Sequence, residues 1–600
     1  MNTNPEPSFG HPKRWQYLLG AGVMFVVLVP LWTMFDVRIL EPDSLTQAEI
    51  PMQKLFLWFG VPALAVGLAF GGQWLALAHE AEVRQEQFKE QVARARKVQA
   101  EARTEQGRRE YVLEIIGLGV TLDKYRQGKL WDALQAGAPQ KSIREQDPKK
   151  YPWTSLNKAQ TSGSRGGDAL ENGALHSPDC WGVPVFNAEP PNLDPNEADS
   201  PIRPSIGLAG GADMSDMSTH LFVAGSRHRT EHPDRILEDV FNFFDANPDI
   251  PFVVLNSDDS MTSRDSYSAP GTPPLLKDGY YIPEMPDAAT LFLLARRERV
   301  DAIRPFAFDD VSYDKGVDYI NRYGVGRRLF LAYLDLRKAV PSKAKLENPK
   351  YAVGRTPMIA EWLPAAAKFA ARPDIRGLGE TGFIDRELNR AHRPPMDWKP
   401  TPWFPVPWSK EQLADFDNLP TLGFLHRPVF VKMTDEHGKP LARRDQRQQA
   451  LAAGWQEALR TLPEEQRGHG PARVIAASGG NVDQMLALER VLHDYGASGG
   501  PELDTGKTKH FINTDRRLGN TGATTLFMQM AIGVMGSYRA GGPSAAVNLR
   551  DPSEASIVLI TPPSEATRKL QTEQRGDVFH HRNAPAIDPA NYAPPGNTAQ

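Results

Sequence analysis

Residues 519–563 constrain the fold of this chain more than any other segment. They predict a helix at 526–538, which Gly541-Gly542-Pro543 ends. Apolar residues lie on nearly every face of that helix, as is typical of a helix inside a core. Short runs rich in β-branched and small apolar residues follow at 545–549 and 556–560, as expected for strands buried on both faces. A buried helix beside buried strands predicts a layered α/β domain.

The same segment resembles the end of the thiolase and ketoacyl-synthase fold, where a Gly-His-x-x-Gly-Ala turn starts a buried helix. The turn here is Gly519-Asn520-Thr521-Gly522-Ala523, so Asn520 stands in the place of a catalytic histidine. Tyr495, in Tyr-Gly-Ala-Ser-Gly, stands in the place of a second one. Neither side chain takes up a proton near neutral pH as imidazole does. The resemblance therefore implies a thiolase-like fold with degenerate active-site positions at Asn520 and Tyr495 and no catalytic residue.

Two uncharged runs, 15–35 and 55–78, are each long enough to cross about 30 Å of hydrocarbon as a helix. They predict a transmembrane hairpin over 15–78. A cleaved signal peptide is disfavoured because the first run is longer than a signal h-region, and a buried soluble hairpin is the other alternative. Basic residues precede the first run and are frequent at 84–109. We therefore expect both ends of the hairpin, and most of the chain, in the cytoplasm.

Composition narrows the classes of function. The 600 residues carry a net charge of −4, which gives no nucleic-acid signature. The single cysteine, Cys180, excludes an internal disulfide and suits a reducing compartment. Cys180 lies in a loop flanked by proline, without the exposed turn and base that a nucleophile needs, so we interpret it as an incidental or buried thiol.

The rest of the sequence predicts α/β layers, because strand-like and helix-like segments alternate in both halves. The similar runs at 251–255 and 428–432 indicate that the two halves are related. One expected strand of the first half is 330–334. The predicted divisions are a cytoplasmic N-terminus 1–14, the hairpin 15–78, a helical spacer 79–110, a first half 111–340 with a loop-rich part 138–204, a connection 341–410, a second half 411–563 and a disordered tail 564–600.

The connection carries aromatic residues among many prolines, notably Trp398, Trp403, Phe404 and Trp408. Two interpretations stay open. The aromatic side chains fill the core between the halves, or they form a partner-binding surface, since aromatic anchors are favoured at interfaces.

The other motifs in the sequence do not predict a cofactor site, a catalytic acid pair or a metal site. Gly117-Leu118-Gly119 lacks the third glycine of a dinucleotide fingerprint, so we interpret these glycines as sites of close backbone packing. Asp258-Asp259 and Asp309-Asp310 follow predicted strands, but acid pairs in turns are common. No metal or cofactor site is expected, since two adjacent histidines at 580–581 are too few ligands.

Taken whole, the chain is similar to the type VI lipase adapter family of Gram-negative bacteria. The similarity rests on the N-terminal hairpin, the segment Tyr111-Val-Leu-Glu-Ile-Ile-Gly-Leu-Gly-Val-Thr-Leu-Asp-Lys-Tyr and the closing Ser556-Ile-Val-Leu-Ile-Thr-Pro-Pro. It implies a non-catalytic adapter at the bacterial inner membrane, which binds a phospholipase effector in the cytoplasm and helps load it onto the VgrG spike. Two alternatives remain: a membrane-tethered acyl-transfer or condensing enzyme that uses Cys180, and a scaffold in an envelope complex. The oligomeric state is left open.

Overall fold

The computed structural model describes residues 112–581, apart from gaps of which the longest are 192–220 and 341–356. The predicted membrane hairpin, the helical spacer and Cys180 lie outside the described residues. Across the residues that are described, no helix is both long and apolar enough to cross a membrane.

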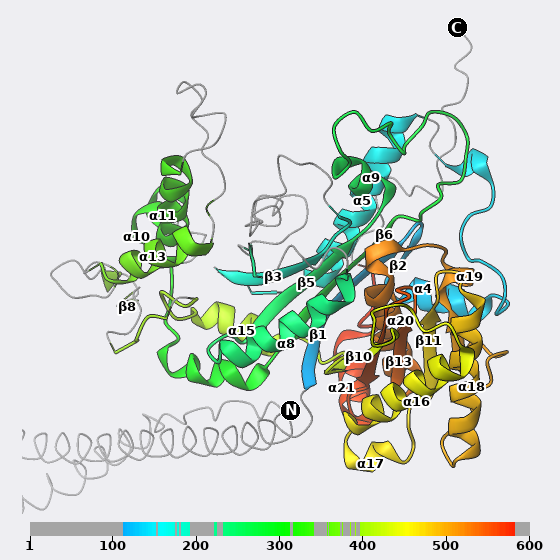
Figure 1. Ribbon diagram of the computed structural model, residues 1–600. Coiled ribbons are helices and arrows are strands. Elements are labelled where there is room, and N and C mark those ends of the chain that lie inside the picture. Colours follow the sequence, from blue (N-terminus) through cyan, green and yellow to red (C-terminus); the bar gives the residue numbers. More distant parts are fainter. Residues whose placement is uncertain are drawn as a thin grey trace, which may run out of the picture. The chain divides into compact units, whose positions relative to one another are not determined.

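The first half is a mixed sheet with the strand order β4-β3-β5-β6-β1. Figure 1 labels β3, β5, β6 and β1 of this sheet. Strands β4, β3 and β5 are parallel, whereas β6 runs antiparallel to both β5 and β1. A two-residue strand, β2, folds back on the end of β1. The bounds are β1 Val112–Leu122, β2 Tyr125–Arg126, β3 Val183–Ala188, β4 Leu221–Val223, β5 Phe252–Asp258 and β6 Ala288–Ala295.

The second half has the order β12-β11-β13-β14-β9. Strands β12, β11 and β13 are parallel, whereas β14 runs antiparallel to β13 and β9. An additional strand, β10, pairs with the beginning of β14. The bounds are β9 Gly423–His426, β10 Val429–Lys432, β11 Arg473–Ala477, β12 Phe511–Asn513, β13 Ser544–Asn548 and β14 Glu554–Thr561.

The two halves repeat one topology. Leaving aside β2 and β10, the strands of each half stand in the spatial order third, second, fourth, fifth, first, and the fifth is antiparallel to its neighbours. The first strands of the halves pair antiparallel through Val112–Ile115 and Gly423–His426, which joins the halves into one continuous sheet. The mixed α/β body expected from the sequence is therefore present, and its halves share a strand order.

Helices cover both faces of this sheet. In the first half α5 packs on β1 and β6, and in the second half α16 and α18 lie across the sheet from α20. The bounds are α4 Gly128–Ala136, α5 Ser155–Ala174, α8 Ile236–Ala246, α9 Met261–Ser266, α10 Val317–Tyr323, α11 Val325–Ala339, α13 Ile359–Ala370, α15 Lys410–Asn418, α16 Arg444–Arg460, α17 Glu464–Arg467, α18 Val482–Ala497, α19 Thr514–Arg517, α20 Thr525–Ala540 and α21 Glu565–Arg575. Short strands β7 Ile384–Asp385 and β8 Arg390–Ala391 pair with each other.

Helix α20 is the buried helix that the sequence predicts, since every residue from Thr525 to Tyr538 is buried. It packs on β11, β13 and β14 and also touches β6 and β1 of the first half. The buried guanidinium of Arg473 donates to the carbonyl oxygens of Gly541 at 2.6 Å and Gly542 at 3.1 Å, just beyond the end of α20. A cation there complements the negative end of the helix dipole.

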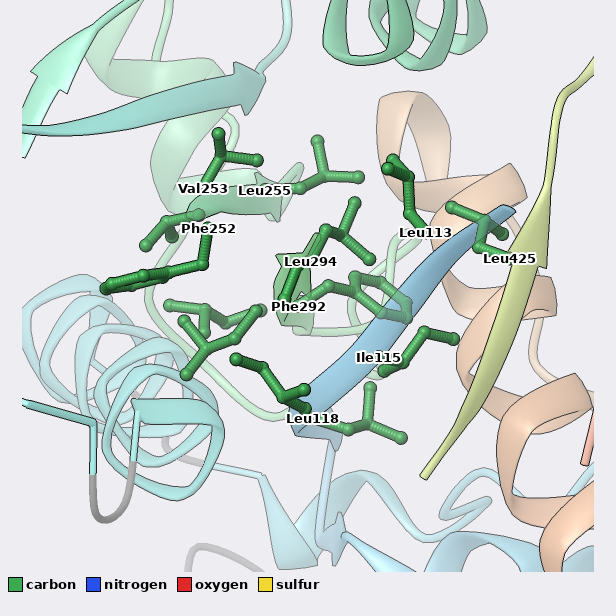
Figure 2. Packing of buried hydrophobic residues seen from close by; sticks show 14 of the residues in the cluster. Leu113, Ile115, Leu118, Phe252, Val253, Leu255, Phe292, Leu294 and Leu425 are labelled. Carbon is green, nitrogen blue, oxygen red and sulfur yellow. The ribbon is translucent and has the colours of Figure 1, made fainter. Parts of the chain in front are cut away.

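Neighbouring residues along a strand face opposite sides of the sheet. In β11, for example, Ile475 packs in the cluster that contains α20, and Val474 in the cluster formed with α16 and α18. The first-half core is built the same way from β1, β5 and β6, where Leu118, Val253 and Phe292 are fully or nearly fully buried (Figure 2). Full burial of one such side chain stabilises a fold by about 1.5–3 kcal/mol.

The close-packing interpretation of Gly117 and Gly119 is confirmed. A Cβ atom at Gly119 would lie 1.7 Å from the carbonyl oxygen of Ala169, and one at Gly117 would lie 2.4 Å from that of Gly173. Helix α5 can therefore approach β1 only where β1 lacks side chains.

Three expectations from the sequence are wrong over the residues that the structure describes. Residues 330–334, expected as a strand, lie inside helix α11, whose buried Leu329 and Tyr333 are spaced as one helical face. The part 138–204, expected as loop-rich, contains the 20-residue helix α5. The tail expected to be disordered begins with helix α21, and Phe579 beyond it is 2 % exposed and stacks edge-on against Tyr538. In the last two cases tertiary burial outweighs local composition.

Candidate functional site

A cavity of about 470 Å³ lies where the carboxyl end of β5 meets that of β13. The carboxyl ends of strands are the usual location of binding sites in open α/β sheets. Both halves contribute to its lining, with Asp234, Asp259 and Arg264 from the first and Asn548, Arg550 and Asp551 from the second.

Asp259 joins the two halves at this cavity. Its Oδ2 accepts a hydrogen bond from the backbone N–H of Ala523 at 2.5 Å, inside the short helix η8 (Gly522–Thr524) that leads into α20. Its other oxygen, Oδ1, lies 2.7 Å from Nε of Arg264. The Asp259 side chain is fully buried, and burial raises its pKa above the ordinary value, while Ala523 and Arg264 act in the opposite direction. Asp259 therefore supplies an internal anion at a helix start.

Gly522 permits this contact. Its φ is +54°, and a Cβ atom there would lie 2.0 Å from Oδ2 of Asp259. Only glycine adopts this backbone region at little cost and leaves room for the carboxylate.

Asn520 precedes η8 and lies beside the same cavity. Its Oδ1 accepts hydrogen bonds from the N–H of Gly522 at 3.0 Å and from Nη2 of Arg550 at 2.5 Å. Nη1 of Arg550 reaches the hydroxyl of Thr525 at 3.3 Å. The side chain in the predicted histidine position thus fixes a turn and an arginine.

Two further polar contacts connect the halves along the cavity. His232 Nδ1 lies 2.8 Å from Oδ2 of Asp551, and the guanidinium of Arg235 forms an ion pair with the carboxylate of Glu554, with Nε 2.9 Å from Oε1. These contacts run from η4 (Pro233–Arg235) and the residue before it to the β13–β14 connection and the start of β14. The charged side chains of the cavity are thus largely engaged with one another.

Asp234 is the buried member of this set. Nδ2 of Asn548 donates to its Oδ2 at 2.9 Å. Burial raises the pKa of Asp234 to about 6, against the effect of hydrogen bonds from Ser556 and Asn548. At neutral pH the folded protein therefore keeps this carboxylate ionised at a cost in stability.

Tyr495 lies far from Asn520 in the architecture. It is near the end of α18, where its ring meets that of Trp455 edge-on at 5.8 Å. A Cβ atom at Gly470, which precedes β11, would lie 2.0 Å from the Tyr495 hydroxyl, so the phenol is at the amino edge of the parallel strands. Asn520 is at their carboxyl edge. The structure does not bring the two degenerate positions together, because α18 carries the chain back across the sheet after β11.

The aromatic side chains of the connection are mostly internal. Trp403, Phe404 and Trp408 are 7 %, 7 % and 4 % exposed. Trp408 packs against Phe416 with ring centroids 5.2 Å apart. Trp398 is partly buried and donates from Nε1 to the carbonyl oxygen of Phe404 at 3.3 Å. These contacts match the core interpretation, and the three buried rings expose little surface in this structure.

The paired acids have structural partners. Asp258 accepts from the hydroxyl of Ser263 at 2.7 Å, and burial raises its pKa to about 6. Asp309 pairs with Lys410 at 2.8 Å, and Asp310 accepts from the N–H groups of Val325 and Gly326 at the start of α11. Among the described residues, no group of three or more His, Cys, Asp or Glu side chains is arranged to hold a metal ion.

Sequence reasoning missed most of the cavity. Asp234, His232 and Arg550 follow no motif, and they meet only because η4 and the β13–β14 connection, more than 300 residues apart in the chain, lie side by side. The one available signal was Asp259 directly after a strand.

Two family models and several solved structures are similar to this chain. Residues 111–278 match the N-terminal family model of the type VI lipase adapter protein Tla3, and residues 422–562 match its C-terminal model. Among solved structures, an ishigamide ketosynthase/chain length factor is similar at 10 % identity and a TM-score of 0.33, covering 76 % of this chain and 99 % of that one. Human mitochondrial 3-ketoacyl-CoA thiolase is similar at 9 % identity and a TM-score of 0.31, with 76 % and 99 % covered.

The structural likenesses are too weak to indicate chemistry. The two family models, in contrast, together match just over half of the 600 residues, in chain order, one in each half of the sheet. The chain therefore belongs to the type VI lipase adapter family.

Proposed function

We propose that this protein is a non-catalytic adapter that binds a type VI secretion lipase effector in the cytoplasm and helps load it onto the VgrG spike. Membership of the lipase adapter family supports the adapter role. The two uncharged runs at 15–35 and 55–78 support anchoring at the bacterial inner membrane, with the bulk of the chain in the cytoplasm.

One observation supports the non-catalytic part of the proposal above all others: the N–H of Ala523 already donates its hydrogen bond to the carboxylate of Asp259. Acyl transfer requires donors aimed at a developing oxyanion and a group that moves a proton. At this helix start the donor is held by the protein's own anion. Asn520, in the place of a base, is held by Arg550 and cannot take up a proton near neutral pH.

The test is to purify the tagged full chain in detergent from its own cells and to identify a co-purifying lipase. That lipase is then prepared separately, and its binding to the full chain is measured by isothermal titration calorimetry. We expect a saturable complex. Absence of any lipase, or of binding by the purified lipase, would reject the adapter role.

The enzyme alternative is tested on the same preparation. Condensation and hydrolysis of short and long acyl-CoA are measured with the wild type and with Cys180→Ala. We expect no turnover above the protein-free rate in either. Turnover that Cys180→Ala abolishes would establish a thiol-dependent acyl-transfer enzyme instead.

Anchoring and orientation need a separate experiment. Membrane fractionation followed by protease treatment of spheroplasts should leave the chain membrane-bound, with residues 112–581 protected. Release of this part by external protease would contradict the cytoplasmic location.

A further inference from the structure

The cavity between the carboxyl ends of β5 and β13 has room for a ligand. Its volume of about 470 Å³ lies within the usual range of ligand pockets, about 300–1,000 Å³. At its mouth stand His232 and Asp551, whose side chains are 48 % and 32 % exposed. Asp234 and Asp259 also line the cavity but are only 8 % and 0 % exposed. A group that enters from solvent therefore meets buried carboxylates.

Acids outnumber bases in the lining. Four carboxylates line the cavity, against two arginines and one histidine, and they belong to Asp234, Asp259, Asp551 and Glu554. Both arginines are engaged by the protein itself, since Arg264 pairs with Asp259 at 2.7 Å and Arg550 donates to Asn520 at 2.5 Å. An anionic ligand would meet an excess of like charge here, so the lining favours a cation.

Asp234 is the carboxylate that this excess leaves without a counter-charge. Its Oδ2 accepts from Nδ2 of Asn548 at 2.9 Å and Ser556 supplies another hydrogen bond, but both donors are neutral. Across the described part of the chain, no arginine, lysine or histidine forms an ion pair with Asp234, and the like charges of Glu554 and Asp551 raise its pKa. Burying an ionised group without a counter-charge is costly. A cation that reaches Asp234 therefore gains an interaction that the protein leaves unmade.

The size and spacing of the lining suit an organic cation better than a metal ion. Calcium takes six to eight oxygen ligands, and no three acidic or histidine side chains of the described residues converge in that way. A guanidinium or ammonium group, in contrast, can pair with a single carboxylate through its N–H donors, and such charged hydrogen bonds are the strong ones. Asp551 at the mouth offers further acceptor oxygens, because its partner His232 is charged only when protonated.

We propose that this cavity binds a guanidinium or ammonium group, which pairs with Asp234, and that the group is a basic side chain of the lipase. The inference rests on the proposed adapter function and names a contact through which the lipase is bound. Because both halves line the cavity, a side chain inserted there contacts both at once. Side chains that fill a desolvated pocket are the anchors that dominate the binding energy of an interface, and arginine is frequent among them.

The experiment compares Asp234→Asn with a matched control, Asp258→Asn, in the full chain in detergent. Burial raises the pKa of both acids to about 6, and asparagine keeps the size of the side chain while it removes the charge. Asp258 is held by the hydroxyl of Ser263 and is not among the residues that line the cavity. The two variants therefore differ in whether the lost charge faces the cavity.

The wild type and both variants are titrated by isothermal titration calorimetry with the purified lipase that co-purifies with the protein. Separate titrations use agmatine and spermidine, which carry guanidinium and ammonium groups without a protein. The lipase titrations are then repeated with agmatine present and with sodium chloride at the same ionic strength. Urea denaturation, followed by tryptophan fluorescence, reports whether each variant is folded.

We expect Asp234→Asn to weaken lipase binding at least about tenfold, while Asp258→Asn binds as the wild type does. At pH 7 Asp234→Asn should also be more stable than the wild type, because it no longer buries an unpaired charge, so unfolding cannot account for the lost binding. Agmatine should weaken lipase binding to the wild type more than sodium chloride does, because it competes for the cavity.

Unchanged lipase binding by Asp234→Asn, or an equal loss in Asp258→Asn, would overturn the proposal. So would binding of agmatine or spermidine that depends on Asp234 but leaves lipase affinity intact, since the cavity would then serve a free small cation. A wild type that binds no lipase would reject the adapter function itself. In that case the agmatine titration still decides whether the cavity takes a cation.

Discussion

The contact between Asp259 and the start of η8 makes Gly522→Ala the most informative single substitution. Two effects add. A residue with a Cβ atom held at a φ of +54° is destabilised by about 1–2 kcal/mol. The new Cβ would also lie 2.0 Å from Oδ2 of Asp259, so the carboxylate must leave the N–H of Ala523, and a charged hydrogen bond of this kind is worth about 1.5–3 kcal/mol. We expect a total loss of roughly 3–5 kcal/mol.

Gly438→Ala separates the two effects. Gly438 has a φ of +77°, and an added Cβ would meet no atom within 4 Å. This control should lose only the backbone part, about 1–2 kcal/mol. The assay is urea denaturation of the full chain in detergent, followed by tryptophan fluorescence.

A second comparison uses Asp259→Ala. In that background Gly522→Ala should lose only about as much as Gly438→Ala does, because the clashing carboxylate is gone. Equal losses for Gly522→Ala and Gly438→Ala in the otherwise unchanged chain would refute the argument that Asp259 joins the halves through η8.

Three further substitutions test other parts of the structure. Burial raises the pKa of Asp234 from 3.8 to about 6, so the unfolded chain releases this proton first and stability falls as pH rises from about 4 to 6. Asp234→Asn should therefore stabilise the protein by up to about 3 kcal/mol at pH 7 but not near pH 4, measured by urea denaturation at both values. Burial lowers the pKa of His426 to about 4, so as pH falls the unfolded chain takes up this proton first and stability falls between pH 6.5 and 4. His426→Asn should reduce that fall by up to about 3 kcal/mol in the same denaturation assay. An unchanged pH profile of stability would contradict the burial of His426. Trp408→Ala should lower stability by about 3–5 kcal/mol in the same assay while the folded fraction still binds the lipase as tightly as the wild type, and a selective loss of binding would restore the partner-site interpretation.

The elements that could be predicted from sequence are those whose local pattern and tertiary burial agree. Helix α20 is an example, because its apolar residues, its preceding turn and its glycine stop all indicate the same element. Gly117 and Gly119 are another, because the absence of side chains in a buried strand has few explanations other than close packing.

The failures have a common physical cause. Helix α5 is rich in glycine, serine and asparagine, and it is helical because Ala169, Gly173 and their neighbours pack on β1, which no local propensity records. Helix α21 is polar along most of its length, and the chain after it is held by Phe579. The sequence cannot show such anchors before the partner surfaces are known.

The candidate site was the least predictable part. Asn520 could be placed at the start of the buried helix, and it lies beside the cavity. Tyr495 was assigned because Tyr-Gly-Ala-Ser-Gly stands where the resembled family has its second histidine motif, and that resemblance does not show that α18 returns to the other edge of the strands. The cavity itself depends on contacts between His232, Asp234 and residues more than 300 positions later, which no local motif encodes.

The central claim is that this α/β body binds a lipase and performs no acyl chemistry. Its most direct test is one titration of the purified full chain with its co-purified lipase, with acyl-CoA turnover followed in the same samples. We predict a saturable complex and turnover no faster than in buffer. Acyl-CoA turnover that Cys180→Ala abolishes, with no complex formed, would contradict the account.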